Sequence, residues 1–88
     1  MITMEKAIKI YKSYGGHFFD EDTMVYWNSK IVSPLFSNRC FVTGEDNYNK
    51  TEYLFSIRQF SEDFSTVYTI DFQEWDNLER ARNYAEQL

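Results

Sequence analysis

The stretch TEYLFSIRQFSEDFSTVYTIDF, residues 51–72, decides the predicted fold. Within it, large apolar side chains recur at every second position: Tyr53, Phe55, Ile57, Tyr68, Ile70 and Phe72. Because successive side chains of a β-strand point to opposite faces, this period predicts strands over 51–60 and 65–72. The polar segment Ser61-Glu62-Asp63 is typical of a short reversal. The two strands should therefore form an antiparallel hairpin whose aromatic face belongs to the core.

Further strands are expected upstream of this hairpin. The compact run Arg39-Cys40-Phe41-Val42-Thr43 predicts a strand, and the polar, turn-prone stretch 44–50 should end it. The β-branched and aromatic run 23–27 predicts the first strand, preceded by a charged turn. Ile31-Val32 is short, and the nearby Pro34 lacks the backbone donor of a strand ladder, so this segment is expected at the edge of the sheet.

Helices are expected at both ends of the chain. Two apolar stripes follow helical spacing: Met4, Ala7, Ile8 and Tyr11 near the start, and Leu78, Ala81, Ala85 and Leu88 at the end. Thr3 can cap the first helix and Gly15-Gly16 can end it, which predicts a helix over 3–14. Asp76, with Glu79 three residues later, predicts a capping box at the start of the last helix.

These elements predict an α+β fold in the order α-β-β-β-β-α. It consists of a three- or four-stranded antiparallel sheet with the N-terminal and C-terminal helices packed on one face. A chain of 88 residues has room for one hydrophobic core, so residues 1–88 are expected to form a single domain.

Composition and charge exclude several classes of function. Aromatic residues make up 19% of the chain, which is unlike a disordered segment. The net charge of −5 disfavours direct binding to nucleic acid or to an anionic membrane, because both require a cationic surface. The apolar runs are too short for a membrane span or a signal peptide. A single cysteine fits a reducing compartment, so a cytoplasmic location is expected.

The sequence contains no pattern typical of a catalytic, cofactor or metal site. One His and one Cys cannot build a structural zinc site, and a calcium loop starting at Asp20 would place Val25 where glycine is needed. Cys40 lies within an expected strand and His17 in a connection, so both are expected to be structural. An enzyme using this pair stays open only if Cys40 proves reactive in the folded protein. We therefore expect no enzymatic activity, no cofactor and no metal.

Three segments carry a resemblance to known proteins: Phe41-Val42-Thr43-Gly44-Glu45-Asp46, Tyr53-Leu54-Phe55-Ser56-Ile57-Arg58 and Asp71-Phe72-Gln73. Together they resemble a group of small uncharacterised phage and prophage proteins, from which the chain departs at Gly44 and at Ile70-Asp71. The resemblance implies an origin in a mobile element. Accessory phage genes of this size often encode inhibitors of host defence, anti-CRISPR proteins among them, and many such inhibitors are acidic proteins that act by occupying a surface.

The acidic residues gather at the expected turns and suggest a surface for a partner. In an antiparallel meander, the turns at 20–22 and 45–46 should lie at the same end of the sheet. The predicted partner-binding surface therefore comprises Asp20, Glu21, Asp22, Glu45 and Asp46, with Tyr48 as an aromatic anchor. The leading hypothesis is a non-enzymatic, phage-encoded protein that binds and inhibits a host protein through this surface. The host protein would belong to a defence or nucleic-acid-handling complex.

A second hypothesis comes from a different class of protein. The segment 31–36 is apolar, broken by Pro34, and hard to assign to a core. An exposed sheet edge or aromatic patch of this kind is typical of proteins that associate with further copies of themselves. The alternative function is therefore a structural or regulatory subunit that forms homo-oligomers.

Overall fold

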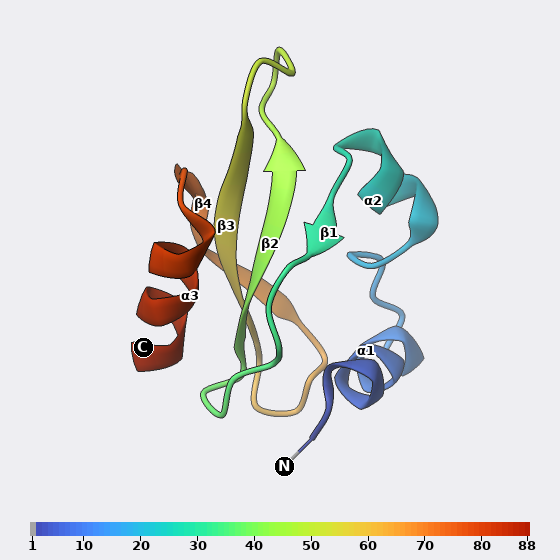
Figure 1. The fold of residues 1–88 in the computed structure, drawn as a ribbon. Helices are drawn as coiled ribbons and strands as arrows, with labels where there is room; N and C mark the ends of the chain where they lie inside the picture. The colour runs from blue at the N-terminus through green and yellow to red at the C-terminus, as the bar shows by residue number, and fades with distance from the viewer. Residues whose placement is uncertain (1) are drawn as a thin grey trace.

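The computed structural model describes residues 2–88 (Figure 1). Its elements follow in the order α1 (Met4–Ser13), α2 (Glu21–Tyr26), β1 (Lys30–Ile31), β2 (Cys40–Asp46), β3 (Tyr53–Phe60), β4 (Val67–Trp75) and α3 (Leu78–Gln87). The strands form one antiparallel sheet in the order β1-β2-β3-β4. The α+β class, the antiparallel sheet and the two terminal helices are thus confirmed. Within residues 2–88, no helix is long and apolar enough to cross a membrane.

The terminal helices begin and end close to where the sequence predicts. The hydroxyl of Thr3 accepts a hydrogen bond from the Lys6 backbone N–H, and Gly15 follows α1 with a φ of 86°, which favours glycine. At α3 the expected cap is wrong by one residue. Asn77, not Asp76, is the N-cap, and its side chain accepts from the Arg80 backbone N–H at 3.0 Å.

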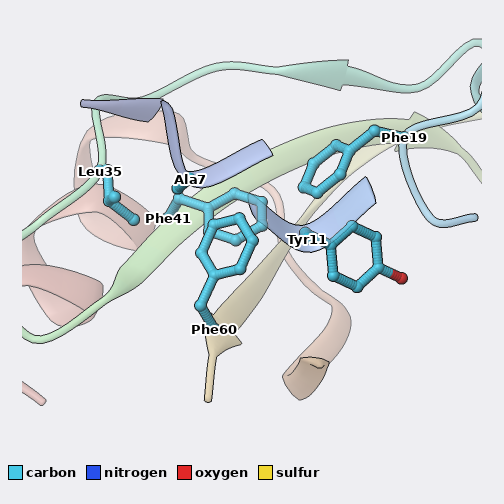
Figure 2. Close-up of a cluster of buried hydrophobic side chains, with 6 residues drawn as sticks. All are labelled: Ala7, Tyr11, Phe19, Leu35, Phe41 and Phe60. Atoms are coloured by element: carbon cyan, nitrogen blue, oxygen red, sulfur yellow. The ribbon is translucent and has the colours of Figure 1, made fainter. Parts of the chain in front are cut away.

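The two terminal helices pack on opposite faces of the sheet, which corrects the prediction that they share one face (Figure 1). One core cluster joins α1 to the sheet and consists of Ala7, Tyr11, Phe19, Leu35, Phe41 and Phe60 (Figure 2). The other joins α3 to the sheet and consists of Cys40, Val42, Ile57, Ala81 and Ala85. Because Phe41 and Val42 are neighbours on β2, their side chains point to opposite faces, and both faces are covered.

The segment expected as the first strand is instead the short helix α2. Its first turn contains Glu21 and Asp22, which suit the positive end of the helix dipole. Asp20 stands at the N-cap position, although its carboxylate lies 2.8 Å from His17 Nδ1 and makes no cap bond. The β-propensity of 23–27 is overridden because helical spacing turns Met24 and Trp27 toward the sheet, where they line a cavity.

Strand β2 is longer than predicted. Gly44, Glu45 and Asp46 were expected in a turn, but they continue the strand and pair with Phe55, Leu54 and Tyr53 of β3. Gly44 suits this position because a Cβ there would lie 2.5 Å from the ring of Tyr53, whose hydroxyl donates to the Gly44 carbonyl at 2.9 Å. The reversal comes later, where the Asn47 side chain accepts from the Thr51 backbone N–H.

The aromatic face of the hairpin is not uniformly core. Of that face Ile57 is buried, but Tyr53, Ile70, Tyr68 and Phe72 are exposed, the last two by 54% and 59%. The reason lies in β4, which is an edge strand and has register shifts against β3 around Ile57. Such bulges reset which side chains face the core, so the period of two does not persist along β4.

The segment 31–36 is at the sheet edge, as predicted, but it does contribute to the core. β1 pairs only with β2, through Lys30 with Gly44 and Ile31 with Thr43. Beyond it, Leu35 is buried in the α1 cluster, and Val32 and Phe36 pack against the α3 cluster. Segment 31–36 is therefore not the exposed apolar surface on which the self-association hypothesis was based.

Candidate functional site

The structure separates the residues of the predicted acidic surface. Asp20, Glu21 and Asp22 lie at the start of α2, while Asp46 lies beside the end of α2, where its N–H donates to the Trp27 carbonyl. The six residues of α2 span about 9 Å. Tyr48 is 90% exposed in the β2–β3 loop. Glu45 is not on the surface at all, because only 2% of it is exposed. Its predicted place in the partner-binding surface is therefore wrong.

Glu45 forms a buried ion pair with Arg58 on the neighbouring strand. Arg58 Nη2 donates to Glu45 Oε1 at 3.1 Å, and the Ser56 hydroxyl donates to the same oxygen. The other donors of Arg58 reach two threonines, with Nε 3.1 Å from Thr43 Oγ1 and Nη1 2.6 Å from Thr69 Oγ1. Burial lowers the pKa of Arg58, and the Glu45 carboxylate opposes this shift. A charged guanidinium is thus held inside the fold.

Two phenylalanine rings complete the surroundings of Arg58. Its guanidinium carbon lies 5.1 Å from the ring centroid of Phe18 and 5.6 Å from that of Phe72, both within the range of cation–π attraction. Phe18 is held against α1, because its backbone N–H donates to the hydroxyl of Tyr11 in that helix at 3.2 Å. The chain passes close to Tyr11 here, since a Cβ on Gly16 would lie 2.2 Å from the tyrosine ring.

One atom of the ion pair is left without a partner. Glu45 Oε2 is buried and makes no hydrogen bond, although Oε1 of the same carboxylate accepts two. Buried polar atoms are almost always paired, because an unpaired acceptor loses its hydration without compensation. Oε2 is therefore the polar atom of the described chain that most needs a donor.

Glu45 and Arg58 form part of the wall of a cavity of about 190 Å³ between α2 and the sheet. The helix side of the cavity is mainly apolar, and the sheet side is more polar. The full lining consists of Phe18, Thr23, Met24, Trp27, Ser29, Glu45, Arg58, Phe72 and Gln73. Gln73 is held in place, because its N–H donates to the Ser56 hydroxyl and its side-chain amide to the Asp46 carbonyl. Phe72 is the most exposed of the three aromatic side chains in this lining, with 59% of it exposed.

The volume of the cavity limits what it can hold. Pockets for drug-sized ligands measure about 300–1,000 Å³, so this one has room for a single side chain or a comparably small group. Its lining contains no cysteine or histidine. Within residues 2–88, no group of three or more His, Cys, Asp or Glu side chains is placed to hold a metal ion.

Cys40 and His17 do not form a site together. Cys40 lies in the α3 core cluster, whereas the side chain of His17 is exposed and pairs with Asp20 before α2. Burial raises the pKa of the Cys40 thiol, with Arg39 opposing the shift more weakly. Both effects of burial, a neutral thiol and a blocked approach, disfavour reaction with an electrophile.

We therefore expect iodoacetamide at pH 8 to modify Cys40 at least a hundredfold more slowly in the folded protein than in urea, because the thiolate must first be exposed. The measurement is the mass increase of the intact protein with time. Free cysteine in the same buffer calibrates the reagent. Alkylation of the folded chain as fast as of the urea-unfolded chain would reopen a role for Cys40 in chemistry.

Sequence reasoning missed this cavity and most of its lining. Of the predicted surface residues, Glu45 alone contributes to its wall, in a different role. One signal was available: Arg58 falls within a strongly alternating strand, with polar Ser56 on the same face. A charged side chain on a face that becomes buried requires a partner of opposite charge.

Comparison with known proteins places the chain in one family. A family model described as "Family of unknown function (DUF7447)" matches residues 3–86, so the chain belongs to this family. No curated protein and no solved structure matches the chain.

Proposed function

We propose that this chain is a non-enzymatic protein that binds a partner protein, and that the cavity under α2 receives one side chain of that partner. The proposal rests on Glu45 Oε2, a buried acceptor without a hydrogen bond, on a residue that lines the cavity. A donor supplied by a partner would remove the cost of leaving this oxygen unpaired. A volume of about 190 Å³ favours one side chain as the occupant.

The acidic residues near the cavity support a basic partner. Asp20, Glu21 and Asp22 flank one end of α2 and Asp46 the other, with Tyr48 beyond it in the loop. Charges of this kind at the rim of an interface mainly raise the rate of association, and salt screens them. In this proposal they steer the partner toward the cavity, and the cavity contributes most of the specificity.

We propose further that binding inhibits the partner. The resemblance to phage and prophage proteins supports a host target of the defence type, such as a CRISPR complex, or another nucleic-acid-handling complex. The basic groove of such a complex is open to an acidic competitor. The single free cysteine is in keeping with action in the host cytoplasm. A plaque assay on CRISPR-positive hosts tests this step, and no gain in phage growth when the chain is expressed would contradict it.

The binding step is tested by a matched pair of variants. Phe72 and Tyr68 lie on the same strand and are similarly exposed. Phe72 lines the cavity. Tyr68 pairs with Gln59 of β3 and therefore lies on the opposite face of the sheet, the face that α3 covers. We expect Phe72→Ala to weaken binding to a partner isolated from host lysate by tenfold or more, because exposed aromatic anchors dominate binding energy. Tyr68→Ala should change it less than twofold. Equal effects, measured by titration calorimetry, would place the interface elsewhere.

The second candidate, self-association, has one observation in its favour. β4 is a nine-residue edge strand that exposes Tyr68, Ile70 and Phe72. Unpaired edge strands are sites where a second chain can add to the sheet. The register shifts against β3 and the φ of 52° at Gln73 oppose this, because an irregular edge pairs poorly. A monomer in sedimentation experiments at high protein concentration would leave this candidate without support.

A further inference from the structure

We propose that the cavity recognises an aromatic ring bearing one hydrogen-bond donor, namely the indole N–H of a tryptophan or the hydroxyl of a tyrosine from the partner. This inference rests on the proposed function and specifies the occupant of the same site. Three properties of the cavity lead to it: the aromatic and thioether character of its walls, the unpaired acceptor of Glu45, and the charge already present beside it.

The walls favour a flat aromatic ring. Phe18, Trp27 and Phe72 line the cavity together with Met24. Aromatic pairs gain from edge-to-face and offset contacts, and a thioether sulfur packs favourably against a ring. A planar group of the size of a tyrosine or tryptophan side chain makes all these contacts at once, which a flexible aliphatic chain does not.

The unpaired acceptor requires that the occupant donate a hydrogen bond. Glu45 Oε2 has no donor, while Oε1 is already engaged by Ser56 and Arg58. In this structure Oε2 is covered by its neighbours, so the occupant reaches it only after a wall has shifted. Phe72 is the wall with most freedom to do so, because more than half of it is exposed.

The charge balance favours a neutral donor over a cation. The carboxylate of Glu45 is already compensated by Arg58, whose guanidinium lies within 6 Å of two of the aromatic walls. A lysine or arginine from the partner would add a second buried positive charge beside the first, which is unfavourable without a further anion. An anionic occupant would meet the carboxylate of Glu45. A phenol or indole adds a donor without changing the charge.

Small probes test this inference without the partner. Indole and benzofuran have the same shape, but an oxygen that cannot donate replaces the N–H group in benzofuran. We expect indole to shift the backbone amide NMR signals of Thr23, Ser29 and Gln73 and to bind about tenfold or more tightly than benzofuran, because the latter leaves Oε2 unpaired. The pair p-cresol and toluene should show the same preference. Butylammonium and methylguanidinium should bind more weakly than indole.

Glu45→Gln provides the matched variant. An amide can still accept from Ser56 and Arg58 through its oxygen, but it presents a donor where Oε2 was. The preference for indole over benzofuran should therefore vanish. If the variant does not fold, the probe pairs on the unaltered chain decide alone.

Equal affinity for indole and benzofuran, a stronger response to a cation than to indole, or no response to indole at millimolar concentration would each overturn the inference. These outcomes are separate from those of the proposed function. A partner whose binding depends on Phe72 would still support protein binding even if the occupant is a different side chain. Failure of both experiments would remove the cavity from the binding site.

Discussion

Replacing Arg58 with methionine is expected to lower the free energy of unfolding by about 3–5 kcal/mol, because it leaves the buried carboxylate of Glu45 without its counter-charge. The side chains of both partners are more than nine-tenths buried, so water cannot replace the lost contact. Three hydrogen bonds, to Glu45, Thr43 and Thr69, are lost at the same time. Urea unfolding followed by circular dichroism measures the change.

The double variant Glu45→Leu with Arg58→Met separates charge from packing. Replacing a buried ion pair by apolar residues of similar size is often close to neutral, so the double variant should be more stable than Arg58→Met alone. The Thr43 hydroxyl loses the donor Arg58 and the Ser56 hydroxyl loses the acceptor Glu45, and these losses should keep the double variant below the unaltered protein. The role given to this pair would be contradicted if Arg58→Met were as stable as the unaltered protein, or if the double variant were less stable than Arg58→Met.

Replacing Phe60 with alanine is expected to lower the free energy of unfolding by a similar amount, about 3–5 kcal/mol. Phe60 is fully buried, and its ring lies 5.1 Å from Phe41, 5.3 Å from Phe64 and 5.8 Å from Phe19, measured between ring centroids. Deleting it leaves a cavity at the centre of the cluster in Figure 2, which the surrounding rings cannot fill without leaving their preferred geometry.

The matched control is Phe72→Ala, which deletes the same side chain where 59% of it is exposed. It should cost below about 1 kcal/mol, the range of an exposed cation–π contact and a surface substitution. A protein of this length has a total stability of roughly 4–13 kcal/mol, so Phe60→Ala can unfold much of the population. In that case Phe60→Leu, with a smaller loss, gives the measurable value. Equal costs at the two positions would show that Phe60 is not at the centre of the core.

Most of the secondary structure could be predicted from the sequence because its causes are local. The spacing of Met4, Ala7, Ile8 and Tyr11 sets the face of α1, and Thr3 and Gly15 set its ends. Alternation over 51–60 sets the course of β3. Each of these signals lies within a few residues of the structure that it specifies, so no knowledge of distant segments is required.

The candidate site could not be predicted because its causes are contacts between distant segments. Locally, Gly44-Glu45-Asp46 has the composition of a turn, and Arg58, thirteen residues after Glu45, makes Glu45 part of a strand. The run 23–27 has the composition of a strand, and it forms a helix because Met24 and Trp27 pack over the sheet. Likewise, alternation predicts one face for Tyr68, Ile70 and Phe72, but the register shifts between β3 and β4 break that period.

The sequence by itself therefore determined the α+β class, the antiparallel hairpin and the positions of α1 and α3, because periodicity and capping act over one or two turns. The tertiary structure alone decided that the helices cover opposite faces, that Glu45 and Arg58 meet inside the molecule, and that Phe72 remains outside. The physical reason is that the burial of a side chain depends on what packs against it. In this chain, both faces of the sheet are covered by segments that are distant from it in the sequence, so local patterns do not reveal the packing partners.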